Sequence, residues 1–288
     1  MRKTDPLNEL CFFVSDLHGK KVRYEKLFTA IREREPGLLL FGGDLLPHFR
    51  SREHLDFLME YLVPELAKIK EVLGERYPFV GLILGNDDAR AFETSALQGE
   101  AEGLWHYLHM KQMKYGSYDI YGYSYIPPTP FLLKDWERYD VSRYVDPGCI
   151  PPTEGKRTVP VNPDDAEYGT IQNDLALLTG DHDLTKSVFL FHAPPYQSKL
   201  DRAALDGMKF DHVPLDVHVG SIAIQRFIAE RQPRVTLHGH IHESSRITGD
   251  WKETAGVTRS FSAAWDGSEL ALVEFQLSDP ETATRSLL

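Results

Sequence analysis

The sequence predicts an α/β protein, because short apolar segments of strand length alternate with segments of helical periodicity. The apolar segments lie at residues 10–14, 38–41, 79–84, 188–191 and 235–237. Each is almost wholly apolar, without the polar alternation of a half-solvated sheet, so each is expected to be a strand buried on both faces. A length of 288 residues is within the range of one α/β unit, and we expect a single domain over residues 1–288.

Helices are predicted between these strands. Apolar residues recur at spacings of three and four over residues 55–73, and Ser51 is the expected N-cap. A second helix is expected over residues 162–179, because Asn162 at the N-cap position precedes a proline and two acids. Ser221 is the expected N-cap of a third helix, which should end at the next proline.

The segment 127–163 has a different composition from the rest of the chain. It contains eight of the 18 prolines, at positions 127, 128, 130, 147, 151, 152, 160 and 163. Proline has no backbone N–H, so this insertion should be irregular rather than part of a sheet. Loops of this length are often functional in compact domains. Two interpretations remain open, an ordinary surface excursion and a lid over a substrate site.

Composition and charge restrict the partners of the protein. The formal net charge of −11 argues against a surface that binds long nucleic acid or membranes, since phosphate affinity depends mainly on Lys and Arg. A small anionic substrate held by bound cations remains compatible with this charge. Cys11 and Cys149 are the only cysteines, so no disulfide framework is expected. No apolar run has the length of a membrane span or of a signal peptide, and we expect a cytoplasmic protein.

A side chain that can bind a metal ion follows each of the five apolar segments. Asp16 and His18 follow the first, Asp44 the second, Asn86 the third, His192 the fourth, and His240 and His242 the fifth. Ligands bind at the carboxyl ends of strands in α/β sheets, so these ends converge if the strands lie side by side. Two carboxylates, one amide and four imidazoles suit Mn, Fe, Zn, Ni or Co better than Ca or Mg. The sequence therefore predicts a transition-metal centre.

The series Asp-x-His, Gly-Asp, Gly-Asn, His and Gly-His-x-His resembles the motifs of the calcineurin-like metallophosphoesterases, over residues 10–242. Its third and last motifs are most similar to those of small uncharacterised bacterial and archaeal members. The resemblance implies a four-layer αββα sandwich of two mixed sheets flanked by helices, with final strands near residues 259–264 and 270–276. It also implies that a small phosphomonoester or phosphodiester is hydrolysed by a hydroxide that bridges two divalent ions.

The same resemblance assigns the ligands and the metal. Asp16, His18 and His242 would bind one ion, Asn86, His192 and His240 would bind the other, and Asp44 would bridge them. Manganese is expected first among the transition metals, with Fe, Zn, Ni and Co as alternatives.

The third motif departs from the family pattern, because Asp87 stands where the family usually has a histidine. A carboxylate beside a phosphate repels it unless it is protonated. Asp87 is therefore a general acid with a raised pKa, or the leaving group needs little protonation, or another histidine such as His212 or His218 serves. His218 is the better candidate, because it leads into a helix start that can face an anion. His48 has a similar status, and Asn86, His212 and His218 are the predicted substrate contacts.

Two other functions remain open at this point. A non-catalytic metal-binding scaffold for protein partners is compatible with the fold, although family members of that kind tend to lose metal ligands and this chain keeps all of them. A nuclease that acts on short oligonucleotides is the second alternative, since Lys199, Arg202 and Lys209 could form a local basic rim.

Overall fold

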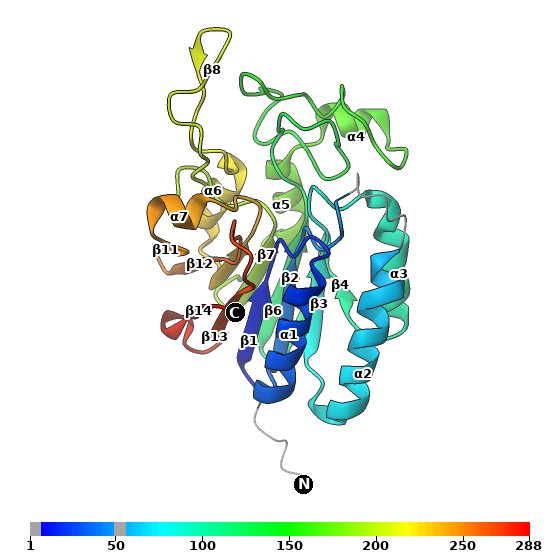
Figure 1. Ribbon diagram of the computed structural model, residues 1–288. Helices are drawn as coiled ribbons and strands as arrows, with labels where there is room; N and C mark the ends of the chain where they lie inside the picture. Colours follow the sequence, from blue (N-terminus) through cyan, green and yellow to red (C-terminus); the bar gives the residue numbers. More distant parts are fainter. Residues whose placement is uncertain (1–6, 49–55) are drawn as a thin grey trace.

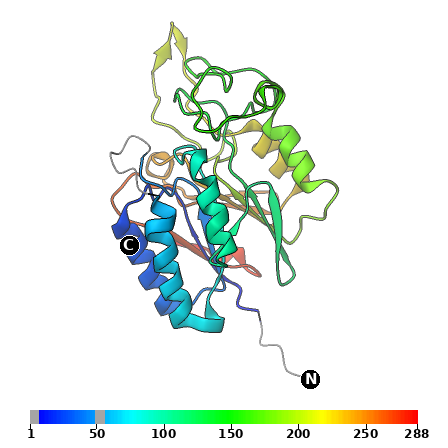
Figure 2. The same cartoon turned by 90° about the vertical axis from the view of Figure 1, so that its right-hand side faces the viewer.

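Two six-stranded sheets pack face to face in the computed structural model, which describes residues 7–48 and 56–288 (Figure 1 and Figure 2). The first sheet consists, in spatial order, of β14 (Thr284–Leu287), β13 (Ala271–Gln276), β1 (Leu10–Val14), β2 (Leu38–Gly42), β3 (Phe79–Ile83) and β4 (His106–Tyr107). The second consists of β11 (Lys252–Ala255), β12 (Thr258–Ser262), β10 (Val235–His238), β7 (Ser187–Phe191), β6 (Tyr118–Tyr123) and β5 (Lys111–Tyr115). Both sheets contain parallel and antiparallel pairs, so both are mixed.

Helices cover the outer face of each sheet and complete the four layers (Figure 1 and Figure 2). The first sheet is covered by α1 (Lys21–Arg34), α2 (Val63–Leu73) and α3 (Glu93–Ala101), and the second by α5 (Ile171–Thr179) and α6 (Ile222–Arg231). The rings of Phe189 in β7 and Phe227 in α6 pack edge to face with centroids 5.0 Å apart, which fastens α6 to the second sheet. The predicted αββα sandwich is therefore the fold of this chain.

The remaining elements are short. They are a π-helical turn η1 (Leu58–Leu62), the helices α4 (Pro163–Tyr168) and α7 (Ser244–Thr248), the single 3₁₀ turns η2 (Gly74–Arg76), η3 (Arg90–Phe92) and η4 (Pro280–Thr282), and a hairpin of β8 (Lys209–Phe210) and β9 (Val213–Pro214).

Strand β1 contributes to two separate apolar cores. Its side chains alternate between the faces of the sheet. Cys11 and Phe13 are buried between the two sheets, in one cluster with Leu237 of β10. Phe12 lies on the other face, in the cluster that contains Leu27 of α1. The apolar character of the whole segment is explained by this burial on both sides, as the sequence predicts.

All five predicted apolar segments are strands, but they are divided between the two sheets. The strands β1, β2 and β3 are parallel neighbours in the first sheet, and β7 and β10 are parallel neighbours in the second. The ends of the five strands therefore converge without all five strands lying side by side in one sheet. Their carboxyl ends meet because the two sheets are stacked, so one edge of the sandwich collects the ends from both.

The sequence misses one helix break. The single helix expected over residues 162–179 is two helices, α4 and α5, separated at Gly169 and Thr170. Thr170 has an extended backbone (φ −130°, ψ 149°), and its hydroxyl accepts a hydrogen bond from the Asn173 N–H, so it caps a new helix instead of continuing the first. Asn162 caps α4 as predicted, by accepting a bond from the Asp164 N–H.

The helix expected over residues 55–73 begins with the π-helical turn η1 and continues as α2. Pro64 has no N–H, and the wider turn before it accommodates the missing donor. The proposed cap Ser51 lies outside the described residues. Ser221 caps α6 as expected, since its hydroxyl accepts a bond from the Ile224 N–H.

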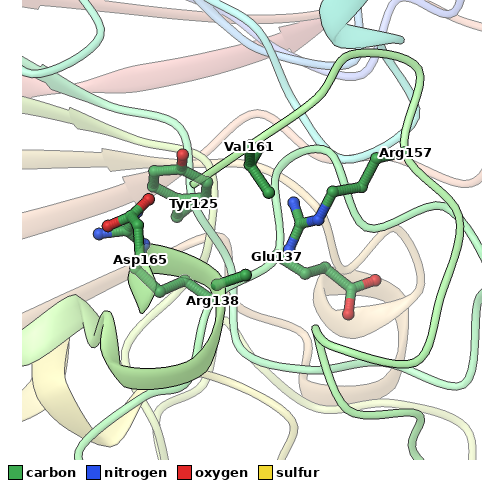
Figure 3. Close-up of a pocket in the computed structure, with 7 residues that line it drawn as sticks. Tyr125, Glu137, Arg138, Arg157, Val161 and Asp165 are labelled. Carbon is green, nitrogen blue, oxygen red and sulfur yellow. The ribbon is translucent and has the colours of Figure 1, made fainter. Parts of the chain in front are cut away.

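The proline-rich insertion is irregular, as its composition predicts, and only isolated bridges interrupt its loops. Its interior is packed around a buried ion pair between Lys134 and Glu137, whose side chains have no exposure. One cavity lies between the insertion and α4, lined by residues that include Tyr125, Glu137 and Arg157 (Figure 3). Its volume of about 10 Å³ has room for a single water molecule, so this cavity is too small for a substrate.

No helix of the described segments, residues 7–48 and 56–288, combines the length and apolar character that crossing a membrane requires.

Candidate metal centre

The loops after β1 and β2 are bonded to each other directly at the edge of the sandwich. The Asp16 N–H donates to the Gly43 carbonyl at 3.0 Å, and the His18 N–H donates to the Asp44 carbonyl at 2.8 Å. Gly43 has a φ of +93°, and a Cβ at this position would lie 2.8 Å from Nδ1 of His192. The glycine before Asp44 is therefore required by the approach of a histidine from the second sheet.

Four of the predicted ligands form a first group. One ligand atom from each of Asp16, His18, Asp44 and His242 lies within 4.8 Å of all the others. Nε2 of His242 is 3.1 Å from Nε2 of His18 and 3.2 Å from Oδ1 of Asp16. Two imidazole nitrogens that face each other at this distance, beside a carboxylate, are well placed to share one cation.

A second group shares Asp44 with the first. Ligand atoms of Asp44, His192 and His240 lie within 4.8 Å of one another. Nε2 of His192 is 3.3 Å from Oδ2 of Asp44 and 3.0 Å from Oδ1 of Asn86, so the amide belongs to the same group. The structure thus brings together all seven residues that the sequence singles out, with Asp44 between the two groups.

The side chains around the centre are oriented as metal ligands require. Nδ1 of His192 donates to the carbonyl of Gly42 at 2.8 Å, which leaves Nε2 to face Asp44 and Asn86. Nδ1 of His18 is buried and has no hydrogen-bond partner within the described part of the chain. Nε2 of the same ring is the nitrogen that faces His242, so Nε2 is the atom available to a cation in the first group, and Nδ1 lies on the side of Asp87.

The charges of the centre favour ionised carboxylates. Burial raises the pKa of Asp16, but the hydrogen bond and charge of His242 outweigh it and lower the pKa to about 2. The pKa of Asp44 is also held well below its usual range, because the neighbouring His192 outweighs the effect of burial. Burial lowers the pKa of His240 to about 3, so its ring is neutral and can offer a lone pair. The donor set fits divalent transition metals.

Asp87 lies at the rim of this centre together with His48. Its N–H donates to Oδ1 of Asp44 at 2.8 Å, and its Oδ2 is 3.3 Å from Nε2 of His48 and 3.8 Å from Nδ1 of His18. The ring of His48 is stacked on that of His18 with centroids 6.1 Å apart, and its side chain is 68 % exposed. The imidazole of His48, which follows the Gly-Asp motif, thus lies beside Asp87. Asp87 occupies the position in the third motif where the family usually has a histidine.

Sequence reasoning misses Asp88, which holds the second and third motifs together. Its carboxylate is fully buried and accepts bonds from the N–H groups of Leu45, Leu46 and Gly85. Burial and the charge of Asp44 raise its pKa to about 7. The sequence shows that Asp88 follows Asn86 and Asp87, but it does not show the three backbone partners of Asp88. Those partners lie in the loops after two different strands, β2 and β3, which come together only in the fold.

Arg23 is a second residue that the sequence does not reveal. Its guanidinium donates to the carbonyls of Asp16 and Gly267, each at 2.6 Å. It therefore holds the backbone of Asp16, a predicted metal ligand, in place. No local sequence pattern marks an arginine in the first helix for this role.

The predicted substrate contacts His212 and His218 lie outside both groups, His212 in the turn between β8 and β9 and His218 four residues after β9. Nδ1 of His218 pairs with the buried carboxylate of Asp201 at 2.7 Å. The helix start that was expected to offer His218 an anion site is already occupied, because Asp140 of the insertion accepts the N–H groups of Ile222 and Ala223. The expectation that this helix start faces an anion beside His218 is therefore wrong. His212 occupies the hairpin turn with a φ of +73°.

The comparisons with known proteins agree with this geometry. The model of the calcineurin-like phosphoesterase family matches residues 11–244, and the chain belongs to that family. Among solved structures, TT1561 of Thermus thermophilus has a TM-score of 0.56 and 15 % identity, over 97 % of this chain and 98 % of its own. A dimetal phosphatase from Danio rerio has a TM-score of 0.54 and 12 % identity, over 94 % of each chain. These likenesses establish the fold. The curated proteins include no match.

Proposed function

We propose that this protein is a phosphoesterase with a dinuclear centre that hydrolyses a small phosphomonoester or phosphodiester. The observation that carries the proposal is the convergence of seven side chains from two sheets into two groups that share Asp44. The similar protein from Danio rerio is a dimetal phosphatase, which supports the same number of ions on this fold.

The chemistry follows from what the residues can hold. Two divalent ions would supply Lewis-acid stabilisation of phosphate charge and a water nucleophile with a strongly lowered pKa. Asp16 and Asp44 would balance only part of the charge of such ions, which leaves the centre attractive to a phosphate in an acidic protein. Oδ1 of Asn86 faces the second group, while its Nδ2 lies 3.4 Å from Oδ1 of Asp87 at the rim and is available to a phosphate oxygen. Manganese is the proposed metal, and Fe, Zn, Ni and Co are alternatives.

A small substrate is favoured over an oligonucleotide. Two residues of the expected basic rim are paired, Lys199 with Asp250 and Arg202 with Asp206. Paired cations release fewer counterions from nucleic acid and contribute less affinity for it. The scaffold alternative is weaker, since a binding scaffold has no need for seven convergent metal-binding side chains. A cytoplasmic location remains a prediction from the sequence.

The direct test is hydrolysis by purified protein loaded with Mn²⁺. The substrates are p-nitrophenyl phosphate, bis-p-nitrophenyl phosphate and 2′,3′-cyclic nucleotides, and the variants are Asp44→Asn and Asp164→Asn. We expect Asp44→Asn to lose more than about 100-fold in kcat/KM. Mutation of a residue that only hydrogen-bonds to a metal ligand already lowers metal affinity or activity by about 10–100-fold, and Asp44 is itself a proposed ligand. Asp164 is an exposed acid of α4, and its variant should retain wild-type activity. Equal rates for wild type and Asp44→Asn on every substrate would reject the proposal.

We propose that Asp87 acts at the leaving oxygen, with His48 as its partner. The contact of 3.3 Å between Oδ2 of Asp87 and Nε2 of His48 places an acid and an imidazole at the exposed rim beside both groups. A group in this position matters most when the leaving oxygen needs a proton.

The dependence on the leaving group tests this role. Asp87→Asn should lower kcat at least about 100-fold for an alkyl phosphate but only a few-fold for p-nitrophenyl phosphate, because nitrophenolate leaves without a proton. His48→Asn should show the same selectivity in weaker form. Equal effects of Asp87→Asn on both esters would remove it from this step.

A further inference from the structure

The proline-rich insertion is bonded to the loop that carries Asn86. Nε1 of Trp136 donates to the carbonyl of Asp88 at 2.8 Å. The carboxylate of Asp135, which is fully buried, accepts the Arg90 N–H at 2.8 Å. The guanidinium of Arg90 also lies over the ring of Trp136, 5.0 Å from its centroid. Two neighbouring residues of the insertion therefore hold the loop of the third motif at two points shortly after Asn86.

The same part of the insertion is bonded to the loop that carries His192, by way of the start of α6. The carboxylate of Asp140 accepts a bond of 2.6 Å from the Ile222 N–H and another of 2.6 Å from the hydroxyl of Ser221. Ser221 in turn is paired with the chain just after His192, because its N–H donates to the carbonyl of Pro194 at 2.9 Å. Asp140 therefore holds the backbone that holds this loop.

The two loops that the insertion joins carry ligands of the same predicted group. Nε2 of His192 lies 3.0 Å from Oδ1 of Asn86. The first group has other supports, which are the bonds between the loops after β1 and β2 and the bond from Arg23 to Asp16. Within the described part of the chain, no hydrogen bond joins the insertion to a ligand loop of the first group. The insertion thus supports one group selectively.

The residues around and between the two attachments are closely packed. Lys134 and Glu137 form a buried ion pair, and Arg138 donates to both carboxylate oxygens of Asp174 in α5, at 2.7 and 2.9 Å. The guanidinium of Arg138 lies 4.4 Å from the centroid of the Tyr125 ring (Figure 3). The cavity beside them has a volume of only about 10 Å³. Close-packed interiors deform little, so this part of the insertion fixes the separation of the two loops.

We propose that Trp136 and Asp140 are positioning residues for the second group of ligands. They hold the loops of Asn86 and His192 at the separation that one shared ion requires. The proposal rests on the dinuclear centre of the proposed function. It adds that a segment outside the metal-binding motifs determines the affinity for one of the two ions and not for the other.

Mn²⁺ binding to the chelator-treated protein tests the proposal without a substrate. Equilibrium dialysis over a range of Mn²⁺ concentrations gives two dissociation constants for the wild type. Trp136→Phe keeps an aromatic ring but removes the N–H donor, so the carbonyl of Asp88 loses its partner. We expect one dissociation constant to rise at least about threefold, less than the 10–100-fold typical of residues that bond directly to a ligand, and the other to stay unchanged. Asp140→Asn should raise the same constant.

Arg23→Lys and Asp164→Asn are the matched controls. Arg23→Lys keeps the positive charge but disturbs the support of Asp16 in the first group, so it should raise the other dissociation constant. Asp164→Asn removes the same charge as Asp140→Asn from an exposed acid of α4, and it should change neither constant. A general loosening of the fold, in contrast, would raise both constants together.

Three results for Trp136→Phe would overturn the proposal while the wild type still binds two ions. The variant could leave both dissociation constants unchanged, raise both to the same extent, or raise the constant that Arg23→Lys raises. Failure of the proposed function has a different appearance, in which the wild type itself binds fewer than two ions, and it removes this proposal as well.

Discussion

Four of the seven predicted metal ligands are residues with left-handed backbones. The φ values are +58° for Asp16, +47° for His18, +52° for Asp44 and +72° for His240. Non-glycine residues in this region are uncommon and cost roughly 1–3 kcal/mol each when the surroundings enforce them. The bonds between the first two motif loops and the support from Arg23 maintain these conformations. Contacts within the protein thus hold the candidate ligands in place, at the expense of local backbone strain.

Asp88 supplies the first prediction at the scale of single residues. Asp88→Asn replaces one acceptor oxygen by an amide donor that faces backbone N–H groups, so at least one buried N–H loses its partner. We expect the metal-free protein to lose about 2 kcal/mol in its free energy of unfolding, the usual cost of an unsatisfied buried donor. Urea unfolding followed by circular dichroism measures this change, and an unaltered midpoint would show that the carboxylate does not hold the loops.

His109 supplies a second prediction, on pH. Burial, with the nearby charges of Arg90 and Arg138, lowers the pKa of this histidine to about 3. Below about pH 6.5 the unfolded chain binds a proton here that the folded protein does not, so stability present above pH 6.5 is lost as the pH falls toward 3. The loss from this group is about 1.4 kcal/mol per pH unit.

The comparison of His109 with a neutral residue isolates that contribution. His109→Gln should be destabilised at pH 7 but should lose stability less steeply between pH 6 and pH 5, as measured by urea unfolding at each pH. Parallel slopes for wild type and variant would contradict the prediction.

At the scale of elements, the insertion is attached to both halves of the sandwich. Trp136 bonds to the loop after β3, and Asp140 caps the start of α6 in the second half. Sequence reasoning predicts its irregular structure from the prolines but not these attachments, because they join residues 48 and 82 positions apart. The lid role, one of the two interpretations of this segment, stays an untested prediction, and Trp136 and Asp140 bond this part of the insertion to the rest of the protein.

Asp140→Ala tests the attachment to α6. The carboxylate accepts the N–H groups of Ile222 and Ala223 and the hydroxyl of Ser221, and it lies at the positive end of the helix. Its removal should destabilise the protein by about 1–2 kcal/mol, the range measured for helix caps. Asp164→Ala, at the exposed start of α4, is the control and should change stability by less than about 0.5 kcal/mol. Equal effects in thermal unfolding would argue against a cap at α6.

At the scale of the whole molecule, the sequence predicts the fold class and the side chains that converge at one edge, but not every strand of the two sheets. The buried strands are visible as apolar runs, and polar side chains directly after them mark the site. The strands β5 and β6 are missed, because the segment Lys-Gln-Met-Lys-Tyr at the edge of the second sheet and the segment Tyr-Asp-Ile-Tyr-Gly-Tyr beside it both mix polar and apolar residues. The contact of His48 with Asp87 is missed as well, since it depends on the approach of two loops.

Metal binding should stabilise the entire fold, because the ligands come from both sheets. A ligand present at 100 times its Kd stabilises a protein by about 2.7 kcal/mol, which corresponds to roughly 5 °C or more in Tm for a chain of this size. We expect Mn²⁺ to raise the Tm of the chelator-treated wild type by this amount and to raise that of Asp16→Asn much less. A Tm that is unaffected by Mn²⁺ in the wild type would contradict binding at these residues.

The central claim is that seven residues hold two ions around Asp44, and the number of bound ions tests it most directly. Equilibrium dialysis of the chelator-treated protein against Mn²⁺, followed by elemental analysis, gives this number per chain. The account predicts two ions in the wild type and in Asp164→Asn, and fewer in Asp44→Asn, in which both groups lose their shared ligand. One ion or none in the wild type, or two in Asp44→Asn with unchanged affinity, would contradict it.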